Sequence, residues 1–162
     1  MHYTRSGLWR LSFVVGLAAA CGGVVAFAQG SDPLVATWKL NLAKSTYSPG
    51  PAPKSQTVKI EGTDKARKIT VDVTPATGAA QHWEVSGPSG TDVPVVGNNP
   101  NADTYVITRV SATTLQAQYK KGGKPTLKQT AVVSADGKTL TVTASGTDVQ
   151  GRTINNVVVY DR

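Results

Sequence analysis

The feature that most constrains the fold of this chain is a repeated alternation of apolar and polar residues in short runs. Each run ends close to glycine, proline, asparagine or aspartate, the residues that favour turns. Alternation with a period of two is typical of a β-strand that buries one face. Runs that follow this pattern more or less regularly predict about ten strands, over 34–40, 57–60, 68–73, 82–85, 91–96, 103–110, 114–119, 124–134, 139–144 and 154–160.

The spacing of these runs limits how the strands can connect. Successive runs are too close for a crossover helix between parallel strands, so we expect antiparallel hairpins in sequential order. Between residues 29 and 162 no run has the length and periodicity of a helix. A sequential antiparallel sheet loses both edge strands when it closes on itself. The predicted fold class is therefore all-β, a single up-and-down antiparallel barrel of about 8–10 strands.

Two segments interrupt the regular pattern. Residues 41–53 follow the first predicted strand and contain several prolines, which exclude a regular helix or a central strand. We expect an extended segment or flap there, where some ligand-binding barrels have a helical lid. In the run 91–96, Pro94 lacks the amide hydrogen that a central strand donates, so this run is expected to be an edge strand or a bulged one.

The start of the chain has the pattern of an export signal. Arg5 and Arg10 precede an apolar stretch, and Ala26-Phe27-Ala28 supplies the small residues that signal peptidase requires. We therefore predict a signal peptide over 1–28 and a single barrel domain over 29–162.

This leader implies export to the periplasm or the extracellular space. The alternative is a lipid anchor on Cys21, because Leu17-Ala18-Ala19-Ala20-Cys21 resembles a lipoprotein processing site. Glycines interrupt the apolar stretch, which is shorter than the roughly 20 residues of a membrane span. We expect no stable membrane span in the mature chain.

Cysteine usage and charge exclude several classes of function. Cys21 is the only cysteine, so the predicted mature domain has no disulfide, no thiol nucleophile and no thiolate ligand for a metal. Arg5 and Arg10 contribute to the net charge of +7, and the other basic residues are scattered along the chain. A nucleic-acid surface would gather them on one face with stacking aromatic residues, so we expect no nucleic-acid partner.

The sequence offers little material for catalysis or metal binding. His82 is the only histidine outside the predicted leader, and general-base or metal chemistry needs partner residues nearby. Asn99, Asn101 and Asp103 are spaced like the start of a calcium loop, but its glycine and distal glutamate are missing. No nucleophile elbow, phosphate loop or dinucleotide motif occurs. We therefore expect no enzyme, no metal site and no cofactor.

Aromatic residues and one arginine at inward-facing positions are the candidate ligand-binding residues. These candidates are Trp38, Trp83, Tyr105, Arg109 and Tyr119. The aromatic residues could line a cavity, or side chains could fill the barrel completely. If Arg109 lies on the same face of its strand as Tyr105, its side chain points inward, where its charge needs a partner. It could then bind the carboxylate of a fatty-acid-like ligand. The opposite phase would place Arg109 outside.

Motifs spread over the predicted domain resemble a known family. They are Trp38-Lys39-Leu40-Asn41, Ser48-Pro49-Gly50-Pro51, Pro94-Val95-Val96-Gly97, Asp136-Gly137-Lys138-Thr139 and Asn155-Asn156-Val157. This set is similar to that of exported bacterial proteins described as lipocalin-like. The resemblance implies a barrel of the lipocalin or calycin kind and, by analogy, a small apolar ligand. Ala36 stands where the lipocalin Gly-x-Trp signature has its glycine.

The same resemblance implies a structural alternative for Arg109. In calycins an arginine stacks near the tryptophan of the first strand and caps one end of the barrel. By analogy Arg109 would stack on Trp38, and Arg162 is a rival for that place.

Two hypotheses of function follow. The first is a secreted binding module that holds a small hydrophobic or amphipathic molecule inside the barrel. The second is a structural or protein-interaction domain of the cell envelope, with a filled interior and a partner bound through the loop at Pro49 or the loop at Pro94. The sequence leaves the ligand and the oligomeric state open.

Overall fold

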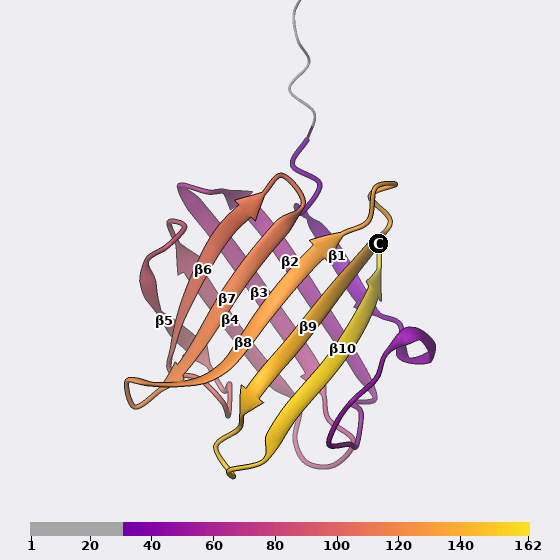
Figure 1. The fold of residues 1–162 in the computed structure, drawn as a ribbon, viewed down its shortest axis with the longest axis vertical. Coiled ribbons are helices and arrows are strands. Elements are labelled where there is room, and N and C mark those ends of the chain that lie inside the picture. Colours follow the sequence, from indigo (N-terminus) through magenta and orange to yellow (C-terminus); the bar gives the residue numbers. More distant parts are fainter. Residues whose placement is uncertain (1–30) are drawn as a thin grey trace, which may run out of the picture.

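The computed structural model describes residues 31–162, which form one closed antiparallel barrel of ten strands (Figure 1). The predicted all-β, up-and-down barrel is confirmed. The predicted signal peptide over 1–28 and its alternative, a lipid anchor on Cys21, lie outside the described residues. Within the described residues, no helix is both long enough and apolar enough to cross a bilayer.

The strands follow one another around the barrel in sequence order. Their bounds are β1 Ala36–Leu40, β2 Ser55–Thr63, β3 Ala66–Thr74, β4 Gln81–Gly87, β5 Asp92–Gly97, β6 Thr104–Ser111, β7 Thr114–Lys121, β8 Lys124–Val133, β9 Thr139–Thr147 and β10 Thr153–Asp161. Each strand pairs with its neighbours in the chain, and β1 pairs with β10 to close the sheet. No described strand is left at an edge, so the barrel has no free row of backbone donors and acceptors.

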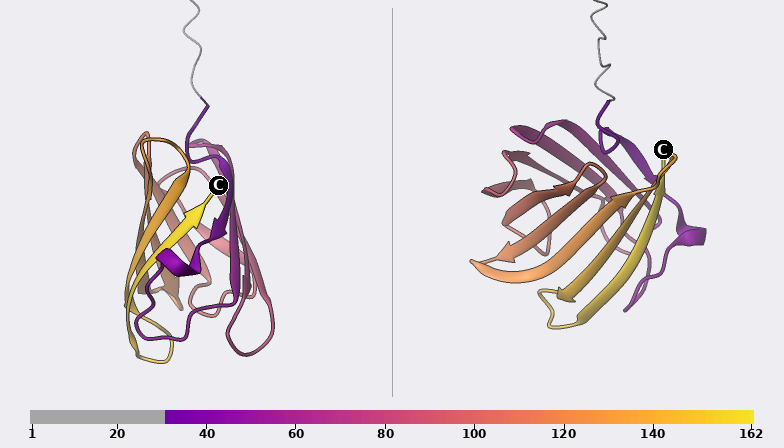
Figure 2. Two further views of the ribbon diagram at one scale, coloured as in Figure 1. Left: turned by 90° about the vertical axis from the view of Figure 1, so that its right-hand side faces the viewer. Right: turned by 45° about the horizontal axis from the view of Figure 1, so that its top comes forward.

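The segment after β1 completes the closure. Only Lys39 and Leu40 of β1 pair with β10, and the ladder is then continued by Thr46, which forms a bridge with Val157. Between them lies a three-residue 3-10 helix over Leu42–Lys44, beside β10 on the outer side of the barrel (Figure 2). The expectation of a segment without a regular helix fits residues 41–53, apart from this single turn.

Residues 91–96 were expected to form an edge strand or a bulged one. The edge position is wrong, because β5 lies inside the closed sheet between β4 and β6. Proline is accommodated there because each half of β5 pairs with one neighbour. Residues 92–94 pair with β6, and residues 95–97 pair with β4. Pro94 therefore faces no partner on β4 that would need its missing amide hydrogen.

Inward-facing residues alternate along the strands as the sequence predicts, and they form one core. Leu34 and Trp38 are completely buried, and the Trp38 indole donates to the carbonyl oxygen of Leu34 over 3.1 Å. The guanidinium carbon of Arg162 lies 5.6 Å from the centre of the Trp38 ring. Arg162 therefore occupies the stacking position for which Arg109 was the other candidate.

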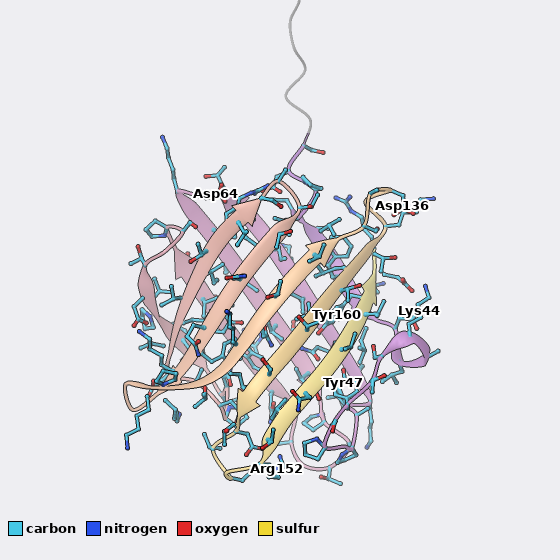
Figure 3. The ribbon with its side chains drawn as sticks, viewed as in Figure 1. Lys44, Tyr47, Asp64, Asp136, Arg152 and Tyr160 are labelled. Carbon is cyan, nitrogen blue, oxygen red and sulfur yellow. The ribbon has the colours of Figure 1, made fainter. Side chains whose placement is uncertain are left out.

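Ion pairs and packed side chains close one end of the barrel. Asp32 accepts from Nη2 of Arg67 over 2.9 Å and from Nη1 of Arg109 over 2.5 Å. Asp64, at the upper end in Figure 3, accepts from Arg67 over 2.8 Å. The opposite end carries Arg152 in Figure 3 and holds the loops that connect β3 to β4, β5 to β6 and β9 to β10.

Candidate functional site

Three adjoining hollows lead from the middle of the barrel to its open end. The inner cavity has a volume of about 70 Å³ and lies among residues such as Ile107, Leu115 and Tyr119. The throat, of about 160 Å³, shares Gln56, Trp83, Tyr119, Gln129, Val142 and Tyr160 with the inner cavity. The mouth, of about 480 Å³, shares Tyr47, Gln56, Gln81, Trp83, Pro100, Asn101 and Asn156 with the throat. Because neighbouring hollows share these residues, they lie next to one another along the barrel, and we refer to the three together as the path.

The inner cavity combines apolar walls with a small group of polar side chains. Gln129 on β8 accepts hydrogen bonds from the hydroxyls of Tyr105, over 3.3 Å, and Tyr119, over 2.9 Å. The rings of these two tyrosines are tilted by 42° with their centres 4.1 Å apart. Burial raises the pKa of Tyr119 to about 12 and the pKa of Tyr105 well above its usual value. Both hydroxyls therefore stay neutral at physiological pH.

The throat is more polar than the inner cavity but is equally uncharged. Trp83, which is 8% exposed, forms part of its wall. The Tyr47 hydroxyl and the Asn99 amide nitrogen are buried without a hydrogen-bond partner among the described residues. Burial raises the pKa of Tyr47 to about 12. In Figure 3, Tyr47 lies on the segment beside β10, and Tyr160 lies on β10 itself.

The mouth is built from loops rich in proline. Pro49, Pro51, Pro53, Pro75 and Pro100 all contribute to it. Because proline fixes its own backbone torsion, these loops lose little further freedom when a molecule binds against them. The loop between β9 and β10 is fixed by Asp148, which accepts from two backbone amides and from Nε of Arg152 over 2.7 Å.

Electrostatics distinguish this path from a carboxylate-binding site. Every described residue that lines the inner cavity and the throat is uncharged. Among the described residues, Arg152 is the only charged one at the mouth, and Asp148 already neutralises it. An ionised group drawn into the throat would lose water without gaining a counter-charge, which costs several kcal/mol.

The structure brings three of the five candidate residues together. Trp83, Tyr105 and Tyr119 all line the inner cavity. Trp38 and Arg109 lie instead at the closed end and line none of the three hollows. Arg109 does take the phase of Tyr105, but Asp32 and the carbonyl oxygens of Ser111 and Ala112 accept from its guanidinium. That guanidinium is therefore already paired within the chain.

Other residues of the path were missed in the sequence. Gln129 falls in phase with Leu127 and Val133, so a polar residue at an inward position was a visible signal. Gln56 on β2 and Tyr160 on β10 are likewise side chains with a polar group at inward-facing positions of the alternation. Tyr47 and Asn99 lie in loops, where no periodicity predicts which way a side chain points.

Of the residues considered for metal binding or catalysis, Asn99 and Asn101 line the path, whereas His82 and Asp103 do not. His82 lies on the outer face with its Nδ1 atom 2.7 Å from Oδ1 of Asp72, and both side chains are more than half exposed. Among residues 31–162 no group of three or more histidine, cysteine, aspartate or glutamate side chains is placed to hold a metal ion.

Comparison with known proteins gives no independent assignment. No protein-family model matches the chain, and a search of curated proteins finds no match. The resemblance to lipocalin-like proteins therefore stays a prediction, and the functional argument rests on the geometry of the barrel.

Proposed function

We propose that the protein is an exported binding module for a small, uncharged amphipathic molecule, which enters through the mouth and lies in the throat. The observation that carries this proposal is the path itself, open at one end of the barrel and lined by aromatic, amide and aliphatic side chains. Binding sites for small molecules commonly combine apolar walls with a few polar groups in this way. Export is proposed from the leader pattern of residues 1–28.

Titration with N-phenyl-1-naphthylamine, an uncharged probe whose fluorescence rises in apolar surroundings, tests this proposal. We expect saturable binding of one probe per chain. Gln81 lies in the wall of the throat and the mouth, so Gln81→Trp fills the path and should weaken binding by about ten-fold or more.

The matched control is Gln116→Trp, which makes the same change on the outer face of β7 and should leave binding unchanged. Protein that unfolds cooperatively and still takes up no probe would overturn the proposal. Equal binding by the two variants would overturn the location of the site.

The size of the inner cavity favours a second candidate function. Its volume of about 70 Å³ is well below the roughly 300–1,000 Å³ of typical ligand pockets. A barrel filled by its own side chains would suit a structural or protein-interaction domain of the cell envelope, with a partner at the loop of Pro49 or at β5.

Photo-crosslinking in the native host tests this second candidate. A benzoylphenylalanine placed at Val96, which is 65% exposed on β5, should yield one discrete crosslinked partner. The same group at exposed Val110 on β6 serves as the control. The absence of a discrete product at Val96 and in the Pro49 loop would count against this candidate.

A further inference from the structure

Two buried polar atoms belong to residues that line the throat, and they bear on what a bound molecule would present there. The hydroxyl oxygen of Tyr47 and the side-chain nitrogen of Asn99 have no partner among the described residues, and both residues line the throat. Asn99 is only 7% exposed. A buried donor without a partner destabilises the fold unless another molecule satisfies it.

The orientation of the Asn99 amide is fixed by its surroundings. Its oxygen accepts from the backbone N–H of Asn101 over 2.8 Å. A backbone N–H can only donate, so the atom facing it must be the oxygen rather than the nitrogen. The NH₂ group is therefore the one left without a partner, and it offers donors only.

Tyr47 offers a second donor of the same kind. Burial favours its neutral hydroxyl, which can donate to an acceptor in the throat. Within residues 31–162, no lysine, arginine or histidine lines the throat, and the guanidinium of Arg152 at the mouth pairs with Asp148 over 2.7 Å. A neutral acceptor thus gains hydrogen bonds here at a small desolvation cost, whereas a carboxylate loses its hydration without a counter-charge.

We propose that Asn99 and Tyr47 select a ligand that carries an uncharged carbonyl acceptor, as in an amide or an ester, with its apolar part against Trp83, Val142 and Val158. This inference rests on the proposed binding function and defines its ligand class. It also replaces the carboxylate ligand that an inward Arg109 suggested, since that arginine lies at the closed end and pairs with Asp32.

Competition between two ligands of equal length tests the selection. Octanamide and octanoate should each be titrated against bound N-phenyl-1-naphthylamine at about pH 8, where the carboxylic acid is ionised. We expect octanamide to displace the probe at a concentration about ten-fold or more below that of octanoate. If the probe binds but octanoate competes equally well, the selection is wrong while the binding function stands. If the probe itself does not bind, the proposed binding function is wrong, and the proposed selection is wrong with it.

Asn99→Asp changes the chemistry of the throat with little change in shape. Aspartate keeps an oxygen for the N–H of Asn101 but replaces the donor with a charged acceptor. We expect this variant to lose its preference for octanamide and to bind octylammonium more tightly than the unmodified protein does. The control is Asn155→Asp, the same change at an exposed position on β10, which should alter neither ligand's affinity.

Tyr47→Phe provides an independent test because it removes a single oxygen atom. Octanamide affinity should fall by about three- to ten-fold, the range for one neutral hydrogen bond, while probe affinity stays the same. Unchanged octanamide affinity in both folded variants, Tyr47→Phe and Asn99→Asp, would overturn the inference and leave water as the partner of both groups.

Discussion

The Arg67 guanidinium lies 2.9 Å from the carboxylate of Asp32, and the arginine side chain is only 3% exposed. Arg67 belongs to β3, while Asp32 precedes β1. The same carboxylate also accepts from Arg109 on β6. One acidic side chain thus joins the start of the described chain to two strands and closes the end of the barrel opposite the mouth.

We expect Asp32→Ala to lower the free energy of unfolding by about 2–3 kcal/mol, because the buried guanidinium of Arg67 keeps only Asp64 as a counter-charge. Urea unfolding followed by circular dichroism measures this loss. The control is Lys44→Ala, which breaks an exposed ion pair with Asp161 and should cost less than about 1 kcal/mol. Equal losses in the two variants would contradict a structural role for Asp32.

Acid should remove the contribution of Asp32 in a defined range of pH. Burial raises the pKa of this carboxyl, but the hydrogen bonds from Arg109 and Arg67 outweigh that effect and lower the pKa from 3.8 to about 2. Because the pKa is lower in the folded state, the stabilisation is complete above about pH 4 and is lost as the pH falls toward 2.

Parallel unfolding curves of the unmodified protein and Asp32→Asn isolate this effect from that of other carboxylates. The stability difference between the two proteins should be constant near neutral pH and should shrink between about pH 4 and pH 2. A difference that does not change over this range would show that the two ion pairs contribute nothing.

Arg162→Ala tests the contact at the end of the chain. Arg162 stacks on Trp38 and donates to the carbonyl oxygen of Val35 over 2.9 Å. Losing both contacts should cost about 1–2 kcal/mol. Arg162→Lys retains a cation but not the planar guanidinium, so thermal unfolding should place it between the unmodified protein and Arg162→Ala. Identical melting of all three proteins would exclude a stabilising role.

Gly97→Ala should distort the wall of the throat. A Cβ atom at Gly97 would lie 2.2 Å from the carbonyl oxygen of His82 and 2.8 Å from Cα of Trp83, and its φ of +112° also disfavours alanine. We expect a loss of at least about 2 kcal/mol in unfolding free energy together with weaker probe binding. Gly50→Ala, whose Cβ meets no atom within 4 Å, is the control and should change neither measurement.

The fold could be predicted from the sequence because the determining signals are local. Alternation along β2, β3, β7 and β9 specifies which face is buried, and short turns allow only antiparallel neighbours. The position of β5 within the sheet could not be predicted, for a physical reason. Whether Pro94 lies at an edge depends on which neighbour each half of the strand pairs with, and that is a tertiary property.

The candidate site was only partly predictable. Trp83, Tyr105 and Tyr119 follow from the same alternation and meet in the inner cavity. The phase of Arg109 was also visible, but its partner Asp32 is 77 residues away in sequence, and no local pattern reveals such a pair. Tyr47 and Asn99 depend on loop conformations that only the closed barrel defines.

Gln129, Tyr105 and Tyr119 allow a test by substitution. We expect a triple variant at these positions to lose less stability than the single variant Gln129→Leu. Gln129→Leu removes the acceptor of two buried hydroxyls and should destabilise the protein by about 1–3 kcal/mol. Adding Tyr105→Phe and Tyr119→Phe removes the hydroxyls left without that acceptor, so the triple variant should recover most of the loss.

Chemical unfolding of the single and triple variants measures this recovery. The triple variant should also bind the uncharged N-phenyl-1-naphthylamine at least as well as the unmodified protein, because the inner cavity becomes more apolar while Asn99 and Tyr47 in the throat are unchanged. A triple variant less stable than Gln129→Leu would mean that the tyrosine hydroxyls find other partners inside the barrel, and the assignment of Gln129 as their common acceptor would be wrong.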